Sequence, residues 1–129
     1  MLAIDTNVIV RYLTGDQPKQ SPQARALIDA HEVFISMTVL LETEWVLRSA
    51  YGYPPPQVSE ALRALAGLPR VTLADPALAA TALDWMAAGM DFADALHLAR
   101  ADGCAAFFSF DRRFAKVAKR LSRIEVRQP

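Results

Sequence analysis

The first fifteen residues, MLAIDTNVIVRYLTG (1–15), decide the fold. The apolar run at residues 2–4 has the length and composition of a short buried strand, and Asp5 follows it directly. Asp5 and Thr6 can then cap a short helix, which Gly15 ends. A short strand that passes straight into a helix is the unit from which an α/β domain with parallel strands is built.

The rest of the chain repeats this alternation. Further apolar runs of strand length occupy residues 33–35, 71–73, 105–110 and 124–126. Helices are predicted at about residues 21–30, 38–50, 57–66, 76–88 and 92–101, with a last one after Asp111; their predicted caps include Ser21, followed by Pro22, and Asp75 and Asp91. We therefore expect one domain over residues 1–129, a three-layer α/β/α sandwich with a mainly parallel central sheet and helices on both faces.

The composition is that of a globular protein. The 129 residues are 53% hydrophobic and 22% charged, which argues against disorder. No apolar run approaches the ~18 residues that a membrane span needs, and the first residues lack the basic start of a signal peptide. We expect a cytoplasmic protein without a membrane partner.

The single cysteine excludes two classes of stabilising site. Cys104 has no partner for an internal disulfide, and one thiol excludes a cysteine-rich zinc site. Because it precedes an apolar run, we expect it to be a small buried residue. Trp45 and Trp85 are interpreted as core or interface anchors.

The charges balance overall but are unevenly distributed. Lysine and arginine number 14 against 14 acidic residues, so net charge does not indicate a nucleic-acid partner. After Asp111, however, cations outnumber acids, and Arg112, Arg113 and Lys116 come first. These side chains could form only the solvated face of an amphipathic helix, or they could bind a phosphate backbone beside a metal site.

Four acidic residues stand where an α/β sheet presents its functional groups. Asp5 and Asp111 directly follow predicted strands, whereas Glu42 lies one turn into a predicted helix and Asp94 lies in the first turn of another. Sites in open α/β sheets lie at the carboxyl ends of the strands. We therefore expect these four carboxylates to converge at one sheet edge.

A cluster of four carboxylates calls for a cation. Like charges a few Å apart repel each other, so some of the acids would stay protonated unless a cation intervened. Oxygen-only ligands suit magnesium or manganese, which lower the pKa of bound water and stabilise charge on a phosphate. The pattern favours phosphodiester hydrolysis; no nucleophile paired with histidine, as acyl transfer would need, is evident.

Each acid also has a structural explanation. Asp5, Asp91 and Asp111 occupy positions where a helix N-cap contributes about 1 kcal/mol, and Asp94 can complement a helix dipole. For Asp91 we favour the cap alone.

Glu42 is less easily explained in this way. Its neighbours Leu40, Leu41 and Trp45 predict that it is buried, and a buried acid needs partners. Glu44 points about 200° away around the helix and is expected to be solvated.

Several polar residues near these acids have two interpretations. Thr6 and Asn7 could orient Asp5 or a metal-bound water, or merely cap the helix. Ser109 could hydrogen-bond a ligand or serve as a turn hydroxyl. His97 is expected to be a packed helix residue rather than a catalytic base, and His31 to be solvated.

Taken together, four motifs resemble the PIN-domain ribonucleases, and among these the VapC-type toxins of bacterial toxin–antitoxin pairs. The motifs are DTNVIVRYL (5–13), LLETEWVL (40–47), DFADALHLA (91–99) and FSFDRRF (108–114). Each is weak alone, but their order and spacing cover nearly the whole chain.

The resemblance implies a PIN-like fold and a specific activity. Asp5, Glu42, Asp94 and Asp111 match the family's four acids, which bind Mg²⁺ or Mn²⁺ and activate water to cleave RNA. It also implies a homodimer that is inhibited by a cognate antitoxin protein.

The sequence disfavours two other functions. A haloacid-dehalogenase-like phosphatase would have Asp-x-Asp after the first strand, whereas this chain has Asp5-Thr6-Asn7. A non-catalytic PIN-like module for binding RNA or protein would not need all four acids.

Overall fold

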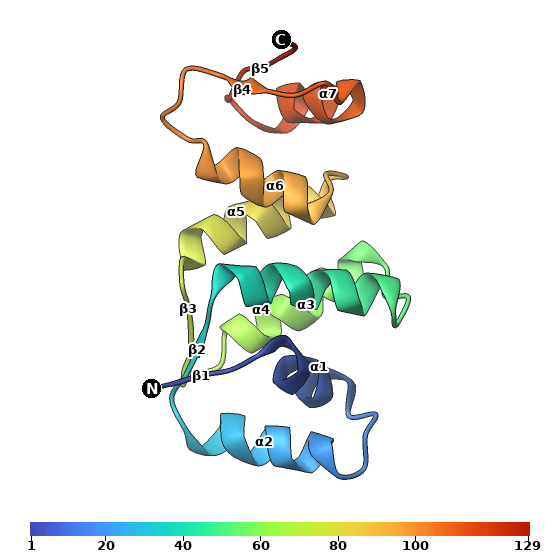
Figure 1. Ribbon diagram of the computed structural model, residues 1–129, viewed down its shortest axis with the longest axis vertical. Helices are drawn as coiled ribbons and strands as arrows, with labels where there is room; N and C mark the ends of the chain where they lie inside the picture. Colours follow the sequence, from blue (N-terminus) through green and yellow to red (C-terminus); the bar gives the residue numbers. More distant parts are fainter. The chain divides into compact units, whose positions relative to one another are not determined.

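The computed structural model describes all residues, 1–129, which form two compact units, Met1–Pro76 and Ala77–Pro129 (Figure 1). The first unit contains β1 (Leu2–Ala3), α1 (Thr6–Thr14), α2 (Gln20–Ala30), β2 (Val33–Ile35), α3 (Met37–Ser49), α4 (Pro55–Ala66) and β3 (Val71–Leu73). Its strands form a parallel sheet in the order β1-β2-β3. Each predicted element of this unit is present within a few residues of its predicted bounds.

The second unit is smaller. It contains α5 (Pro76–Ala87), which begins at the unit boundary, then α6 (Phe92–Arg100), β4 (Phe107–Phe108), α7 (Arg112–Leu121) and β5 (Val126–Arg127). β4 and β5 pair in parallel. All strand pairs are parallel, as predicted, but they form two sheets. β1 and β4 are only two residues long, and each pairs with a single neighbour.

The junction of β1 and α1 is formed as the sequence predicts. The Asp5 carboxylate accepts a hydrogen bond from the backbone N–H of Thr6 at 2.7 Å and caps α1. The helix ends at Gly15, whose φ of 61° lies in the left-handed region. Ile9 and Val10 are buried, and α1 packs against α2 and α3.

The start of α2 differs from the prediction. Ser21 is not the cap; it lies inside the helix, buried, and its hydroxyl accepts from the backbone N–H of Gln17. The Gln17 side chain accepts from the N–H groups of Lys19 and Gln20 instead. This longer side chain reaches two of the free N–H groups, so the helix starts earlier than predicted.

The buried face of α3 also differs from the prediction. Leu40, Thr43, Glu44 and Leu47 are buried, at the i, i+3, i+4, i+7 spacing of one helix face. Glu44 is only 2% exposed and pairs with Arg48 at 3.0 Å, so the prediction that it is solvated was wrong. The prediction that Glu42 is buried was wrong as well, since it is exposed.

We expect Arg48→Met to lower the free energy of unfolding by about 2 kcal/mol, because it would leave the buried Glu44 carboxylate without its ion pair. Chemical denaturation at neutral pH measures this change. Arg123→Met, at an exposed position, is the matched control. Equal stability of the two variants would show that Glu44 does not depend on Arg48.

The segment around β4 is more exposed than predicted. The predicted strand 105–110 is reduced to β4, and Phe108 and Phe110 are 56% and 79% exposed. Only one side of the strand is covered: Phe107 packs edge-on against Phe114 with ring centroids 5.5 Å apart. Cys104, predicted to be buried, is exposed.

No helix has both the length and the apolar character to cross a bilayer.

Candidate functional site

Two of the predicted acids are linked in the first unit. α1 and α3 each follow a strand of the parallel sheet, so both begin at the carboxyl edge of that sheet. Thr6 is 6% exposed, and its hydroxyl donates a hydrogen bond to Oε1 of Glu42, while its backbone N–H holds the Asp5 carboxylate. Asp5 and Glu42 are therefore both fixed by one threonine. Thr6 orients both acids rather than only capping the helix.

A second acidic cluster lies in the second unit. Asp91 caps α6 by accepting from the backbone N–H of Asp94 at 3.1 Å, as predicted. Asp94 is half-buried, one turn into the helix. Burial raises the pKa of the Asp94 carboxyl, and the negative charges of Asp91 and Asp111 raise it further, while His97 opposes the shift. His97 itself is exposed, so the prediction that it is a packed helix residue was wrong.

Asp111 is positioned by its own turn. Its carboxylate accepts from the N–H of Phe114 at 3.0 Å and caps α7, and its own N–H donates to the Ser109 hydroxyl at 3.0 Å. Ser109 is therefore a turn hydroxyl that fixes the backbone at Asp111. The charge of Asp111 still acts on Asp94. Asp111 is thus both the N-cap of α7 and a member of the acidic cluster around Asp94.

The raised pKa of Asp94 predicts a pH-dependent stability in the metal-free protein. A carboxyl with a raised folded-state pKa stabilises the fold most below its ordinary value of 3.8, and this contribution is lost as pH rises through the raised pKa. We expect Asp94→Asn to be the more stable variant at pH 7, with the gap closing toward pH 4. Thermal melts of both proteins in EDTA measure the gap. A gap that is independent of pH would contradict the shift.

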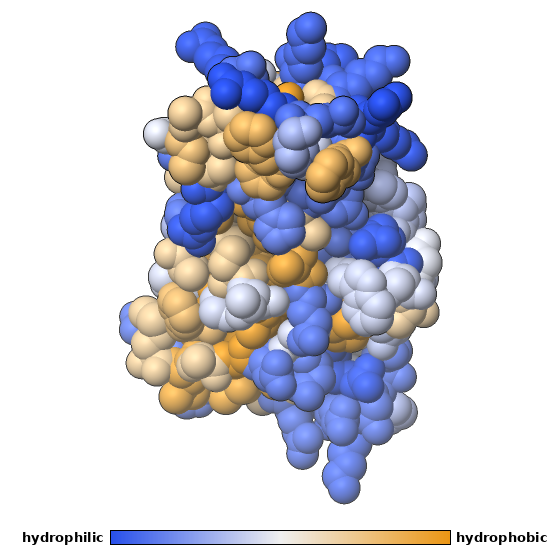
Figure 2. All heavy atoms as spheres, turned by 45° about the horizontal axis from the view of Figure 1, so that its top comes forward, coloured by the Kyte–Doolittle hydropathy of each residue, from blue (hydrophilic) through white to orange (hydrophobic).

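Exposed cations follow Asp111 directly. Arg112, Arg113 and Lys116 lie on the outer face of α7, while Phe114 and Ala118 are buried on its inner face. Figure 2 shows hydrophilic side chains crowded over the part of the molecule that carries α7, at the top of the view. The helix is amphipathic as predicted, and its cations are free of the core.

The acidic side chains carry the ligand atoms that a divalent cation prefers, but they are not grouped closely enough to form a metal site. Carboxylate oxygens are the ligands that Mg²⁺ and Mn²⁺ prefer, and a cation beside Asp94 would offset both the burial and the repulsion that raise its pKa. No group of three or more histidine, cysteine, aspartate or glutamate side chains is arranged in the structure to hold a metal ion. What the structure contains is one linked pair, Asp5 and Glu42, and one interacting pair, Asp94 and Asp111.

Two exposed aromatic residues beside Asp111 were not predicted as functional. Phe108 and Phe110 flank Ser109, and both are more than half exposed. The sequence could have predicted this exposure from the alternation of side chains along a strand: if Phe107 faces the core, Phe108 faces away from it. Exposed aromatic rings among cations form stacking surfaces for single-stranded nucleic acids.

Comparison with known proteins gives a family match and a likeness to solved structures. The model of the PIN domain family matches residues 2–120. The structure is similar to that of VapC20 from Mycobacterium tuberculosis, described as a sarcin-ricin loop cleaving toxin. The two share 21% sequence identity with a TM-score of 0.45, over 90% of this chain and 94% of that one. No curated protein sequence matches this chain.

Proposed function

Because the chain belongs to the PIN-domain family, we propose that it is a metal-dependent endoribonuclease and the toxin of a toxin–antitoxin pair. The observation that carries this is the half-buried Asp94 carboxyl, which lies in the first turn of α6 next to the cap Asp91, and whose pKa is raised by burial and by the charges of Asp91 and Asp111. An acid kept partly buried beside like charges costs stability, so its presence is best explained by a cation that it binds during function.

Asp5, Glu42, Asp94 and Asp111 are the residues that would hold Mg²⁺ or Mn²⁺. When bound, such an ion supplies a water of lowered pKa and positive charge next to the phosphate. Thr6 keeps the Asp5 and Glu42 carboxylates oriented, and the Ser109 turn fixes Asp111. Asn7, exposed in the first turn of α1, is free to contact the substrate.

The substrate is a single-stranded region of RNA. Arg112, Arg113 and Lys116 would bind its phosphates, since they are exposed directly after Asp111. Phe108 and Phe110 would stack against its bases. Both features suit a strand whose bases are unpaired, because bases in a duplex are already stacked.

The toxin assignment adds protein partners. A cognate antitoxin would inhibit the chain in the cytoplasm, and the chain would form a homodimer. Trp45, 57% exposed on α3, is of a residue type that is enriched at the centre of protein interfaces. Its exposure favours the interface role over the core role that the sequence also allowed.

Cleavage of total cellular RNA by the full chain tests the activity. We expect discrete fragments with Mg²⁺ or Mn²⁺ and none with EDTA. A phosphatase assay on a small phosphate ester serves as a control for the haloacid-dehalogenase-like alternative, and no turnover is expected. Intact RNA after incubation with folded, metal-loaded protein would favour the non-catalytic binding module.

The cations of α7 give a separate prediction about affinity. We expect Arg112→Ala combined with Lys116→Ala to weaken RNA binding for all sequences and to lower the slope of log affinity against log salt by about 0.7 per lost phosphate contact. Fluorescence anisotropy with single-stranded RNA in EDTA measures both quantities. Lys19→Ala, exposed before α2, is the control. An unchanged salt slope would assign these cations to the solvated face alone.

A further inference from the structure

A cavity of about 490 Å³ lies between α1 and α2 in the first unit. Its volume falls within the range of about 300–1,000 Å³ typical of small-ligand sites. Val8 and Leu27 supply apolar surface, and Asn7, Arg11, Gln20 and Gln23 supply polar groups.

The polar lining consists mainly of carboxamides. The side chains of Asn7 and Gln23 make no hydrogen bond in the structure, so each offers a free carbonyl acceptor and a free NH₂ donor. Gln20 uses its carbonyl to accept from Nε of Arg11 at 2.9 Å and keeps its NH₂ free. Paired donors and acceptors of this kind match the edges of nucleobases, which carry both.

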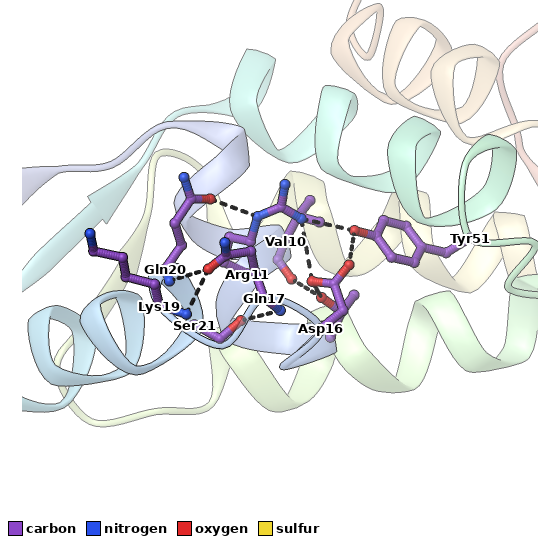
Figure 3. Close-up of polar contacts among 9 residues, drawn as sticks. Val10, Arg11, Asp16, Gln17, Lys19, Gln20, Ser21 and Tyr51 are labelled. Carbon is purple, nitrogen blue, oxygen red and sulfur yellow. Dashed lines mark hydrogen bonds and ion pairs between the residues drawn. The ribbon is translucent and has the colours of Figure 1, made fainter.

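The surroundings of Arg11 favour a base over a phosphate as the ligand. Its Nη1 donates to Asp16 at 3.3 Å and to the Tyr51 hydroxyl at 3.0 Å, and Tyr51 in turn donates to Asp16 at 2.7 Å (Figure 3). Tyr51, Thr14 and Arg11 together lower the pKa of Asp16, which keeps the acid ionised. The charge of Arg11 is thus already balanced, while its hydrogen-bonded side chain is still 30% exposed, so its guanidinium plane can stack against a base.

The cavity also begins beside a proposed metal-binding residue. Asp5 caps α1, and Asn7 lies two residues later in the first turn, about 3 Å further along the helix axis. We propose that this cavity binds the nucleobase of an RNA nucleotide next to the cleaved bond, read by Asn7, Gln20 and Gln23, and so sets the sequence preference of cleavage. The assignment rests on the proposed ribonuclease activity for its role, but not for base binding itself.

Two measurements on the full chain test this assignment. In the first, each of the four nucleoside 5′-monophosphates is titrated into ¹⁵N-labelled protein in EDTA. We expect the side-chain NH₂ resonances of Asn7 and Gln23 to shift, with one base preferred, and Gln23→Leu to weaken that binding about tenfold. Gln57→Leu, the same substitution at an exposed position of α4, should bind as the wild type does.

In the second measurement, cleavage ends are mapped on RNA of random sequence. We expect a base preference next to the cut that falls about tenfold in Gln23→Leu and is retained in Gln57→Leu. A wild-type preference that survives Gln23→Leu overturns the assignment and leaves the nuclease intact. If the wild type cuts no RNA, the titration decides: base-dependent shifts support the cavity while the nuclease fails. Their absence would overturn the cavity as a base site.

Discussion

Asp94→Asn is expected to reduce RNA cleavage by about a hundredfold or more and at the same time to raise the melting temperature of the metal-free protein. Asparagine keeps the shape of the side chain and removes its negative charge. The charged carboxylate is disfavoured by burial and by the charges of Asp91 and Asp111, so removing its charge stabilises the metal-free folded state. The same removal takes away a metal ligand, so activity and stability should change in opposite directions.

Single-turnover cleavage and thermal melts with and without Mg²⁺ measure the two effects. The wild type should gain stability from Mg²⁺, and Asp94→Asn should gain less, because a ligand that binds only the folded state stabilises it. Asp102→Asn, an exposed acid of the same unit, removes the same charge and should leave both quantities unchanged. Cleavage by Asp94→Asn at the wild-type rate would remove Asp94 from the metal site, and a lower melting temperature would show that its charge is favourable.

Features set by a few neighbouring residues were predictable from the sequence. Asp5, Asp91 and Asp111 cap their helices as predicted, and Gly15 ends α1 with a positive φ. Each depends on hydrogen bonds within three or four residues, so the local pattern contains all the information needed. The prediction that Ser21 caps α2 was wrong for a local reason as well. Gln17 is a second nearby acceptor, and the sequence pattern alone does not show which of the two side chains binds the free N–H groups.

Features set by distant packing were less predictable. The helix α3 has large apolar side chains on both sides, Leu40 and Leu47 on one and Leu41 and Trp45 on the other. Hydrophobicity alone therefore could not decide which face is buried, and the buried set includes Glu44, which only its pairing with Arg48 explains. Glu42 was predicted to be a site residue from its place in the helix after the second strand and from its expected burial, and the expected burial was wrong.

The exposed end of β4 shows the same limit. An apolar run such as residues 105–110 predicts a buried strand, but burial requires elements on both sides of it. β4 is packed on one side only, where Phe107 lies against Phe114, and Phe108 and Phe110 are exposed. The proposed stacking of RNA bases on these two rings rests on this exposure, which was not predicted from the sequence.

Thr6→Val is expected to weaken Mg²⁺ binding by about 10- to 100-fold, as is common when a residue that orients a metal ligand is lost. Valine has nearly the same shape but no hydroxyl, so Glu42 loses the hydrogen bond that fixes it, while the backbone N–H that holds Asp5 is kept. Cleavage should fall at limiting Mg²⁺ and recover at saturating Mg²⁺. Thr6→Ser, which restores the donor, should recover most of the affinity.

Thr43→Val separates this orienting role from simple loss of a buried hydroxyl. Thr43 is buried, as Thr6 is, but its hydroxyl donates at 2.7 Å to the backbone carbonyl of Val39, one turn earlier in α3. Both valine variants lose one hydrogen bond and should lose a similar stability of about 1 kcal/mol, measured by denaturation in EDTA. Only Thr6→Val should shift the Mg²⁺ dependence, measured both by cleavage and by the rise in melting temperature. If the two variants shift it equally, Thr6 serves the fold alone, and Glu42 needs no partner to act.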